Sequence, residues 1–108
     1  MAFDAYDRSL DLLRALAALL KKLATIDPDL TRQLRRAAQS ITQNIAEGNR
    51  RAGKDRRHHF RVALGSAAEV GGCLDIARCL DYLGEAEVAP ANELLDRVRA
   101  MTYRLSAR

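Results

Sequence analysis

Residues 40–48 read Ser-Ile-Thr-Gln-Asn-Ile-Ala-Glu-Gly, and this stretch carries the most information about the fold. Its two isoleucines are four residues apart, which is the spacing of one face of an α-helix. Ser40, Asn44 and Glu47 fall on a neighbouring stripe of the same helix. Gly48 is expected to end the helix, because glycine commonly follows the last helical residue. A helix that needed only an apolar face would not carry this polar stripe, so these side chains are expected to hold specific contacts.

The whole chain has the composition of an all-helical domain. Apolar residues make up 48% of the sequence and aromatic residues only 5%, so the core must be built mainly from leucine and alanine, which are strong helix formers. The two prolines, Pro28 and Pro90, leave long stretches free of helix breakers. A chain of 108 residues has the size of one domain, so residues 1–108 are expected to share a single core.

Apolar periodicity predicts four helices separated by short joints. They are expected over residues 4–24, 28–46, 54–83 and 85–105. Asp27 is expected to cap the second helix, with Pro28 in its first turn. Proline is disfavoured inside a helix, so a start of the fourth helix near Ala91, after Pro90, is the alternative. Short joints between long helices make neighbours antiparallel, so the sequence predicts an all-α, antiparallel up-down four-helix bundle.

The first and third helices carry different apolar patterns. The first is expected to bury one stripe, formed by Tyr6, Leu10, Leu13, Ala17, Leu20 and Leu23. The third is apolar or small on nearly every side between residues 60 and 80. Each helix of a four-helix monomer exposes one face, so this excess predicts a second contact surface and self-association. Gly65-Ser66, Gly71-Gly72 and the alanines of this helix would allow another helix to approach closely.

Positive charge is concentrated in the middle third of the chain. Residues 27–61 hold nine Lys or Arg against four Asp or Glu, whereas residues 62–108 hold five against seven. The cluster is either a solvated face or an electrostatic footprint for phosphate groups or an acidic protein. The candidate nucleic-acid-binding residues are Arg32, Arg35, Arg50, Arg51, Lys54, Arg56 and Arg57. Those between residues 50 and 57 are expected to be mostly exposed on one rim of the bundle.

The polar stripe of the second helix has a counterpart on the third. The candidate structural network comprises Arg36, Ser40, Asn44, Glu47, Ser66 and Glu69. We expect Asn44 and Glu47 to be largely buried and hydrogen-bonded, and Arg36 to meet Glu69 or Glu47. The alternative is a ligand-binding or catalytic site. The structural interpretation is preferred because the stripe contains neither a nucleophile with its base nor a set of metal ligands.

Other functional classes lack the residues that they need. His58 and His59 are adjacent and diverge by roughly 100° on a helix, so they cannot hold one metal ion as a pair. Cys73 and Cys79 also face different directions, which predicts free thiols and fits a cytoplasmic protein. No segment approaches the roughly 20 apolar residues of a membrane span. We therefore expect no enzymatic activity, no cofactor, no metal and no membrane association.

Two motifs follow one another at a specific spacing. The first is Arg35-Arg36-Ala37-Ala38-x-Ser40-Ile41-x-x-Asn44-Ile45-Ala46-Glu47-Gly48, followed by Arg51, and the second is Leu64-Gly65-Ser66-x-x-Glu69. Together they resemble the bacterial four-helix bundle family, also called the 23S ribosomal RNA intervening-sequence protein family. The resemblance extends from the first helix to the end of the third. Family members often begin the third helix with an acidic-aromatic pair, where this chain has Arg-Arg-His-His-Phe at residues 56–60.

This resemblance implies a left-handed bundle, a ring-like homopentamer and no catalysis. Related proteins are accessory factors of diversity-generating retroelements, in which a basic pentamer is thought to engage nucleic acid and a reverse transcriptase. The leading hypothesis is a noncatalytic oligomer that binds RNA or DNA through residues 50–61 by salt-sensitive phosphate contacts. The alternative is a protein–protein scaffold that docks a partner enzyme such as a reverse transcriptase.

Overall fold

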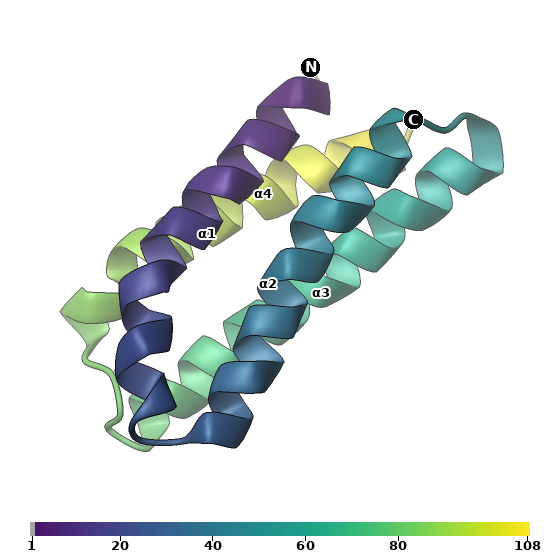
Figure 1. Ribbon diagram of the computed structural model, residues 1–108. Helices are drawn as coiled ribbons and strands as arrows, with labels where there is room; N and C mark the ends of the chain where they lie inside the picture. Colours follow the sequence, from purple (N-terminus) through teal and green to yellow (C-terminus); the bar gives the residue numbers. More distant parts are fainter. Residues whose placement is uncertain (1) are drawn as a thin grey trace.

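A computed structural model describes residues 2–108 and contains four helices (Figure 1). They are α1 (Ala2–Ala24), α2 (Pro28–Asn49), α3 (Gly53–Cys79) and α4 (Glu85–Ser106). Successive helices run antiparallel, and α4 returns to pack against α1, so that each helix contacts two neighbours. The bundle measures 42 × 23 × 19 Å, and the described residues form no strand. The predicted all-α four-helix bundle is confirmed.

The helix ends agree with the predictions in part. The Asp27 carboxylate accepts a hydrogen bond of 3.0 Å from the Leu30 N–H and so caps α2, with Pro28 as the first helical residue. The expected stop at Gly48 is wrong, since α2 continues through this residue to Asn49. The alternative start at Ala91 is also wrong, because α4 begins at Glu85 and Pro90 lies inside it.

The third helix ends at Cys79, earlier than the predicted residue 83. Asp81 adopts a left-handed backbone conformation, with φ of 59°. The N–H groups of Asp81 and Tyr82 donate to the carbonyls of Arg78 and Ala77, at 3.0 and 2.8 Å. This pair of hydrogen bonds is a Schellman motif, which satisfies the last carbonyls of the helix. The left-handed position of this motif is usually occupied by glycine. Because aspartate stands there in this chain, the end of the helix could not be recognised from the sequence.

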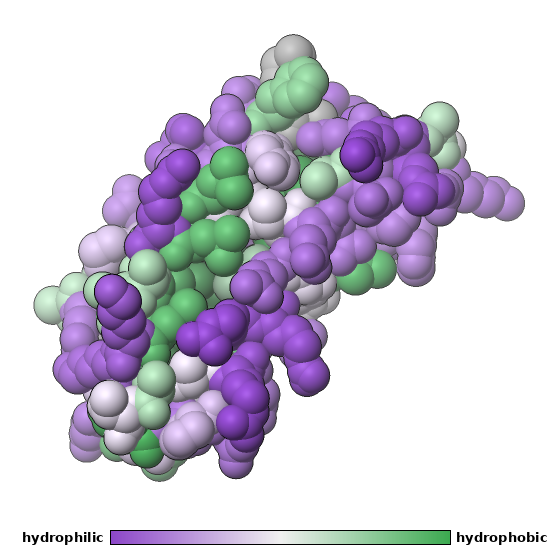
Figure 2. Space-filling view, viewed as in Figure 1, coloured by the Kyte–Doolittle hydropathy of each residue, from purple (hydrophilic) through white to green (hydrophobic). Residues whose placement is uncertain are grey.

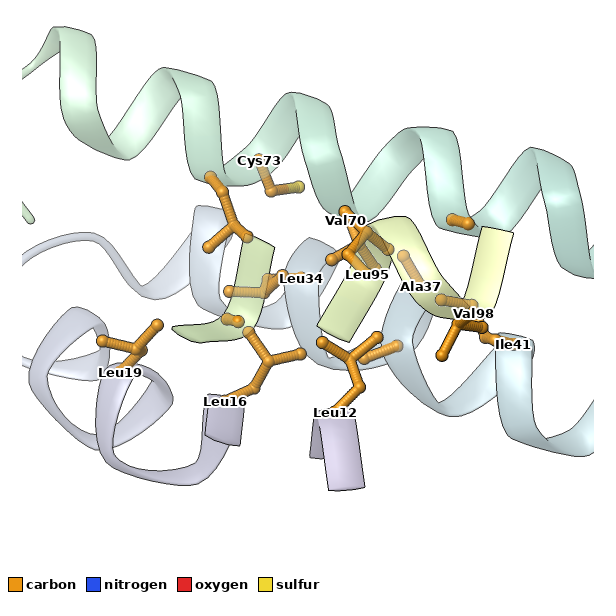
Figure 3. Packing of buried hydrophobic residues seen from close by; sticks show 14 of the residues in the cluster. Leu12, Leu16, Leu19, Leu34, Ala37, Ile41, Val70, Cys73, Leu95 and Val98 are labelled. Atoms are coloured by element: carbon orange, nitrogen blue, oxygen red, sulfur yellow. The ribbon is translucent and has the colours of Figure 1, made fainter. Parts of the chain in front are cut away.

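The core is aliphatic and draws on all four helices. Figure 3 shows side chains such as Leu16, Leu34, Val70 and Leu95 pointing into the space between the helices. The whole predicted stripe of α2 is buried, namely Leu30, Leu34, Ala37, Ala38, Ile41 and Ile45. Phe60 is the one buried aromatic side chain among the described residues, and it is completely enclosed. Leucine and alanine therefore supply most of the stabilising apolar burial.

The buried stripe of α1 differs from the predicted one. Its buried positions are Ala5, Ser9, Leu12, Leu16, Leu19 and Leu23. Of the predicted stripe only Leu23 is buried, whereas Ala17 is exposed and the other members are half-buried. Both stripes have helical spacing and lie roughly 100° apart around α1, so periodicity could not decide which of them faces the core. The second stripe stays at the surface as an apolar band along α1 (Figure 2).

Candidate nucleic-acid interface

A tight contact between α2 and α3 fixes the backbone of the basic segment. A Cβ atom placed on Gly48 would lie only 2.6 Å from the Phe60 ring, so glycine is required for the two helices to meet here. The Arg56 guanidinium lies 4.8 Å from the centre of the same ring and donates a 3.0 Å hydrogen bond to the Gly48 carbonyl. Arg56 is half-buried and held by contacts within the fold, which corrects the expectation that it would be mostly exposed.

A second cation of the segment is held by carboxylates. The Arg51 guanidinium contacts Asp55 at 2.8 Å and Glu47 at 3.3 Å. Its hydrogen bond to Asp55, and then the Glu47 carboxylate, raise the pKa of Arg51. Glu47 also lies 3.9 Å from Arg50. Arg51 is exposed as predicted, but most of its charge is already compensated within the chain.

Three cations at the start of α3 have no carboxylate partner among the described residues: Lys54, Arg57 and Arg61. Their spacing of three and four residues places them on one side of α3. Lys54 and Arg61 are exposed, and Arg57 is half-buried, which corrects the expectation that it would be mostly exposed. Together with Arg50 and Arg51 they form a surface that we call the basic end. It lies at the end of the bundle that also holds both chain termini (Figure 1).

The other two predicted phosphate ligands lie elsewhere. Arg32 and Arg35 are exposed near the beginning of α2. Arg35 is 15 residues before Arg50, or roughly 22 Å along the helix at 1.5 Å per residue. Arg32 is also paired with Asp29. The structure therefore separates these two arginines from the basic end.

The predicted polar network between α2 and α3 exists in smaller form. The Ser66 hydroxyl donates to the Ser40 hydroxyl at 2.8 Å, and the Asn44 amide donates to the Ser40 carbonyl and hydroxyl at 2.9 and 3.1 Å. The Asn44 carbonyl oxygen lies 3.1 Å from Nδ1 of His59. Ser66 is buried, while Ser40 and Asn44 are half-buried. The hydrogen bonds of Asn44 agree with the prediction, whereas the prediction that Asn44 is largely buried is wrong.

Three charged members of the predicted network do not meet as expected. Arg36 and Glu69 are exposed around a hollow of about 300 Å³ between α2 and α3, and no ion pair joins them. Glu47 is half-buried and turns toward Arg51, away from Arg36. The long side chains of Arg36 and Glu69 remain in water, where an exposed ion pair would contribute little stability.

The arrangement offers poor chemistry for catalysis. Asn44 lies between His59 and the two serines, so the network shows no hydroxyl bonded to a general base. Among residues 2–108 no three His, Cys, Asp or Glu side chains converge as metal ligands. Burial raises the pKa of the free Cys73 thiol, and the charge of Glu69 raises it further, which keeps this thiol unreactive. No described helix is long and apolar enough to cross a membrane.

Two residues of this region, His59 and Arg61, lie within the predicted segment 50–61 but were not among the individual candidate residues. The signal for Arg61 was its spacing from Lys54 and Arg57, which places all three on one helix face. The signal for His59 was the antiparallel register of α2 and α3. In an antiparallel pair of helices, the numbers of two facing residues add up to a nearly constant value, so the residue that faces Asn44 can be located. The pair Ser40 and Ser66 sums to 106 and the pair Asn44 and His59 to 103.

Comparison with known proteins finds similar solved structures and a matching protein family. No curated protein matches the chain significantly. A crystal structure described as a protein with unknown function from the S23 ribosomal protein family of Bacteroides thetaiotaomicron superposes with a TM-score of 0.85. It covers 96% of this chain and 99% of its own, and the 20% identity makes this a likeness of fold.

The sequence match is to a family described as 23S rRNA-intervening sequence protein, and it covers residues 1–104. Neither that description nor the description of the solved structure names an enzyme. Because the match spans nearly the whole sequence, the chain belongs to the 23S rRNA-intervening sequence protein family.

Proposed function

We propose that this protein is a noncatalytic, self-associating helical bundle that binds RNA or DNA by phosphate contacts at the basic end. The observation that carries the proposal is the group of cations Lys54, Arg57 and Arg61, which lie on one side of α3 with no carboxylate partner among the described residues. Cations that are not compensated within the fold remain available to phosphate oxygens.

The contacts are expected to be insensitive to base sequence. The one Phe, Tyr or Trp among residues 50–61 is Phe60, which is completely buried and cannot stack on a base. Phosphate contacts alone release counterions, so affinity should fall steeply with salt. A homopentameric ring, which the resemblance implies, would repeat the basic end five times and convert weak contacts into avid binding.

A salt titration with matched variants tests the proposal. We would measure binding of fluorescently labelled RNA and DNA duplexes by anisotropy for the wild type and for Lys54→Ser/Arg61→Ser. The variant should bind more weakly, and its plot of log K against log salt should be less steep by about 0.9 for each duplex phosphate that it no longer neutralises. Arg97→Ser/Arg99→Ser removes the same charge from exposed positions on α4 and should leave the slope unchanged.

Two outcomes would contradict the proposal. If both double variants lose affinity equally, binding depends on net charge and not on the basic end. If the wild type shows no binding at about 50 mM salt, where counterion release favours binding most, the protein–protein scaffold becomes the better hypothesis. A specific observation supports that second candidate, because Ile76 on α3 and Leu80, directly after α3, expose 46% and 54% of their surface.

A further inference from the structure

The apolar band of α1 is a surface that folding of the single chain leaves open. Its members are Tyr6, Leu10, Leu13, Ala17 and Leu20, of which Ala17 is exposed and the others half-buried. Figure 2 shows the band as a continuous hydrophobic strip along α1, beside the hydrophilic outer face of α2. Contiguous apolar surface of this kind on a small protein marks an interaction site.

A second open surface runs along the outer face of α3, from Gly65 to Leu80. We call it the α3 furrow, and it is formed by Gly65, Ala68, Gly72, Ile76 and Leu80, all of them exposed. A Cβ atom built on Gly65 or Gly72 would have no neighbouring atom within 4 Å. Glycine is unfavourable inside a helix relative to alanine, and nothing within the chain requires it at these two positions. Close approach of another helix would account for both glycines.

The two surfaces complement each other in shape. The α1 band carries the larger side chains, among them Tyr6, Leu10 and Leu13, and is the ridge of the pair, whereas two glycines and an alanine leave room for it in the α3 furrow. An antiparallel pairing of two α3 furrows about Gly72 would place the two Glu69 side chains along one border of the contact and the two Asp75 side chains along the other, and like charges repel.

The flanking charges complement each other as well. The α1 band lies between Lys21 on α1 and Arg35 on α2, both exposed and without an ion pair among the described residues. The furrow lies between Glu69 and Asp75, which are also exposed and unpaired there. With the register given by the hydrogen bond between Ser9 and Thr42, the two cations are roughly 8 Å apart along the bundle. The two acids are six residues, or roughly 9 Å, apart.

We infer that the α1 band of one copy packs into the α3 furrow of the next copy, in a head-to-tail contact. This inference rests on the proposed self-association and adds the two faces that make it. Because the ridge and furrow are different surfaces, every copy keeps one of each free, and the assembly closes into a ring or grows. The basic end precedes Gly65 on α3, so it stays outside the contact and open to nucleic acid.

Complementary variants test the contact. Ala17→Glu blocks the ridge and Gly72→Glu blocks the furrow, and both positions are exposed, so neither change disturbs the core. By light scattering after size-exclusion chromatography, each variant alone should be a 12.0 kDa monomer. An equimolar mixture should give a 1:1 heterodimer, because one intact ridge and one intact furrow remain. Ala18→Glu, on exposed surface of α1 outside the band, should assemble like the wild type.

The outcomes separate this inference from the proposed function. If either single variant still assembles, or if the mixture stays monomeric while the wild type assembles, the head-to-tail contact is wrong and self-association stands. If the wild type itself is monomeric at micromolar concentration, self-association fails as well. Nucleic-acid binding is tested independently, since the monomeric variants keep the basic end and should bind duplex with lower avidity but nonzero affinity. Circular dichroism and cooperative melting confirm that each variant is folded.

Discussion

The inner and outer faces of α3 obey different constraints. On the inner face Phe60 is completely enclosed, and its ring occupies the space that a side chain at Gly48 would need. On the outer face Gly65 and Gly72 border open space. The fold of the single chain thus requires glycine at residue 48, which lies against the inner face of α3. It does not require glycine at residues 65 and 72 on the outer face. In our proposals, the residues that folding does not explain are the ones that contact a partner.

The outer face also changes character along its length. It begins with Lys54, Arg57 and Arg61 and continues, from Gly65 onward, as the α3 furrow. This order places charge at the end of the bundle and apolar surface along its side. In our proposals the first part binds phosphate and the second part binds another copy.

The largest effect is expected for Phe60→Ala. Phe60 is the largest completely buried side chain, and its loss leaves a cavity between α2 and α3. We expect a loss of about 3–5 kcal/mol in the free energy of unfolding, which for a domain of this size approaches the whole stability. Urea denaturation followed by circular dichroism measures it. A loss below about 1 kcal/mol would show that the two helices do not depend on this ring.

A smaller loss of stability is expected for Gly48→Ala, and it tests a single contact between α2 and α3. The new methyl group would overlap the Phe60 ring, so we expect a loss of about 1–3 kcal/mol. In a Phe60→Ala background the methyl group has room, and the same change should stabilise by about 1 kcal/mol through helix propensity. Gly71→Ala is the matched control, because its Cβ would make an ordinary 3.6 Å contact with Leu95. Additive effects in the double-mutant cycle would contradict the proposed overlap.

Sequence reasoning could predict features that depend on one helix at a time. The stripe of α2 is interrupted by strongly polar residues on its other sides, so periodicity identified its buried face correctly. The α1 sequence has two apolar stripes at the same spacing, and only the neighbouring helices decide between Leu12 and Leu13 for the core. The roles of Arg56 and His59 depend on the register between α2 and α3, and the sequence of one helix alone does not determine that register.

For Asn44→Leu we expect a loss of about 1 kcal/mol. The change removes the hydrogen bonds to Ser40 and His59, and the low end of the usual range applies because His59 is only half-buried and can turn to water. Thermal and urea unfolding give the value. Gln43→Leu, an exposed neighbour, should change stability by less than about 0.5 kcal/mol. An unchanged stability for Asn44→Leu together with abolished nucleic-acid binding would move this network from the fold to the functional site.

The smallest change in stability is expected at the end of α3, at a residue that belongs to neither its inner nor its outer face. Asp81 holds the left-handed position of the Schellman motif, which costs a residue with a side chain about 1–2 kcal/mol. Asp81→Gly removes that strain but increases the entropy of the unfolded chain, so we expect a net gain of about 0.5 kcal/mol. Asp81→Ala keeps the strain and replaces aspartate, a residue type that tolerates the left-handed conformation better than alanine does, so it should destabilise. Chemical denaturation midpoints of the two variants must therefore move in opposite directions, and a shared direction would show that the backbone conformation at residue 81 does not limit stability.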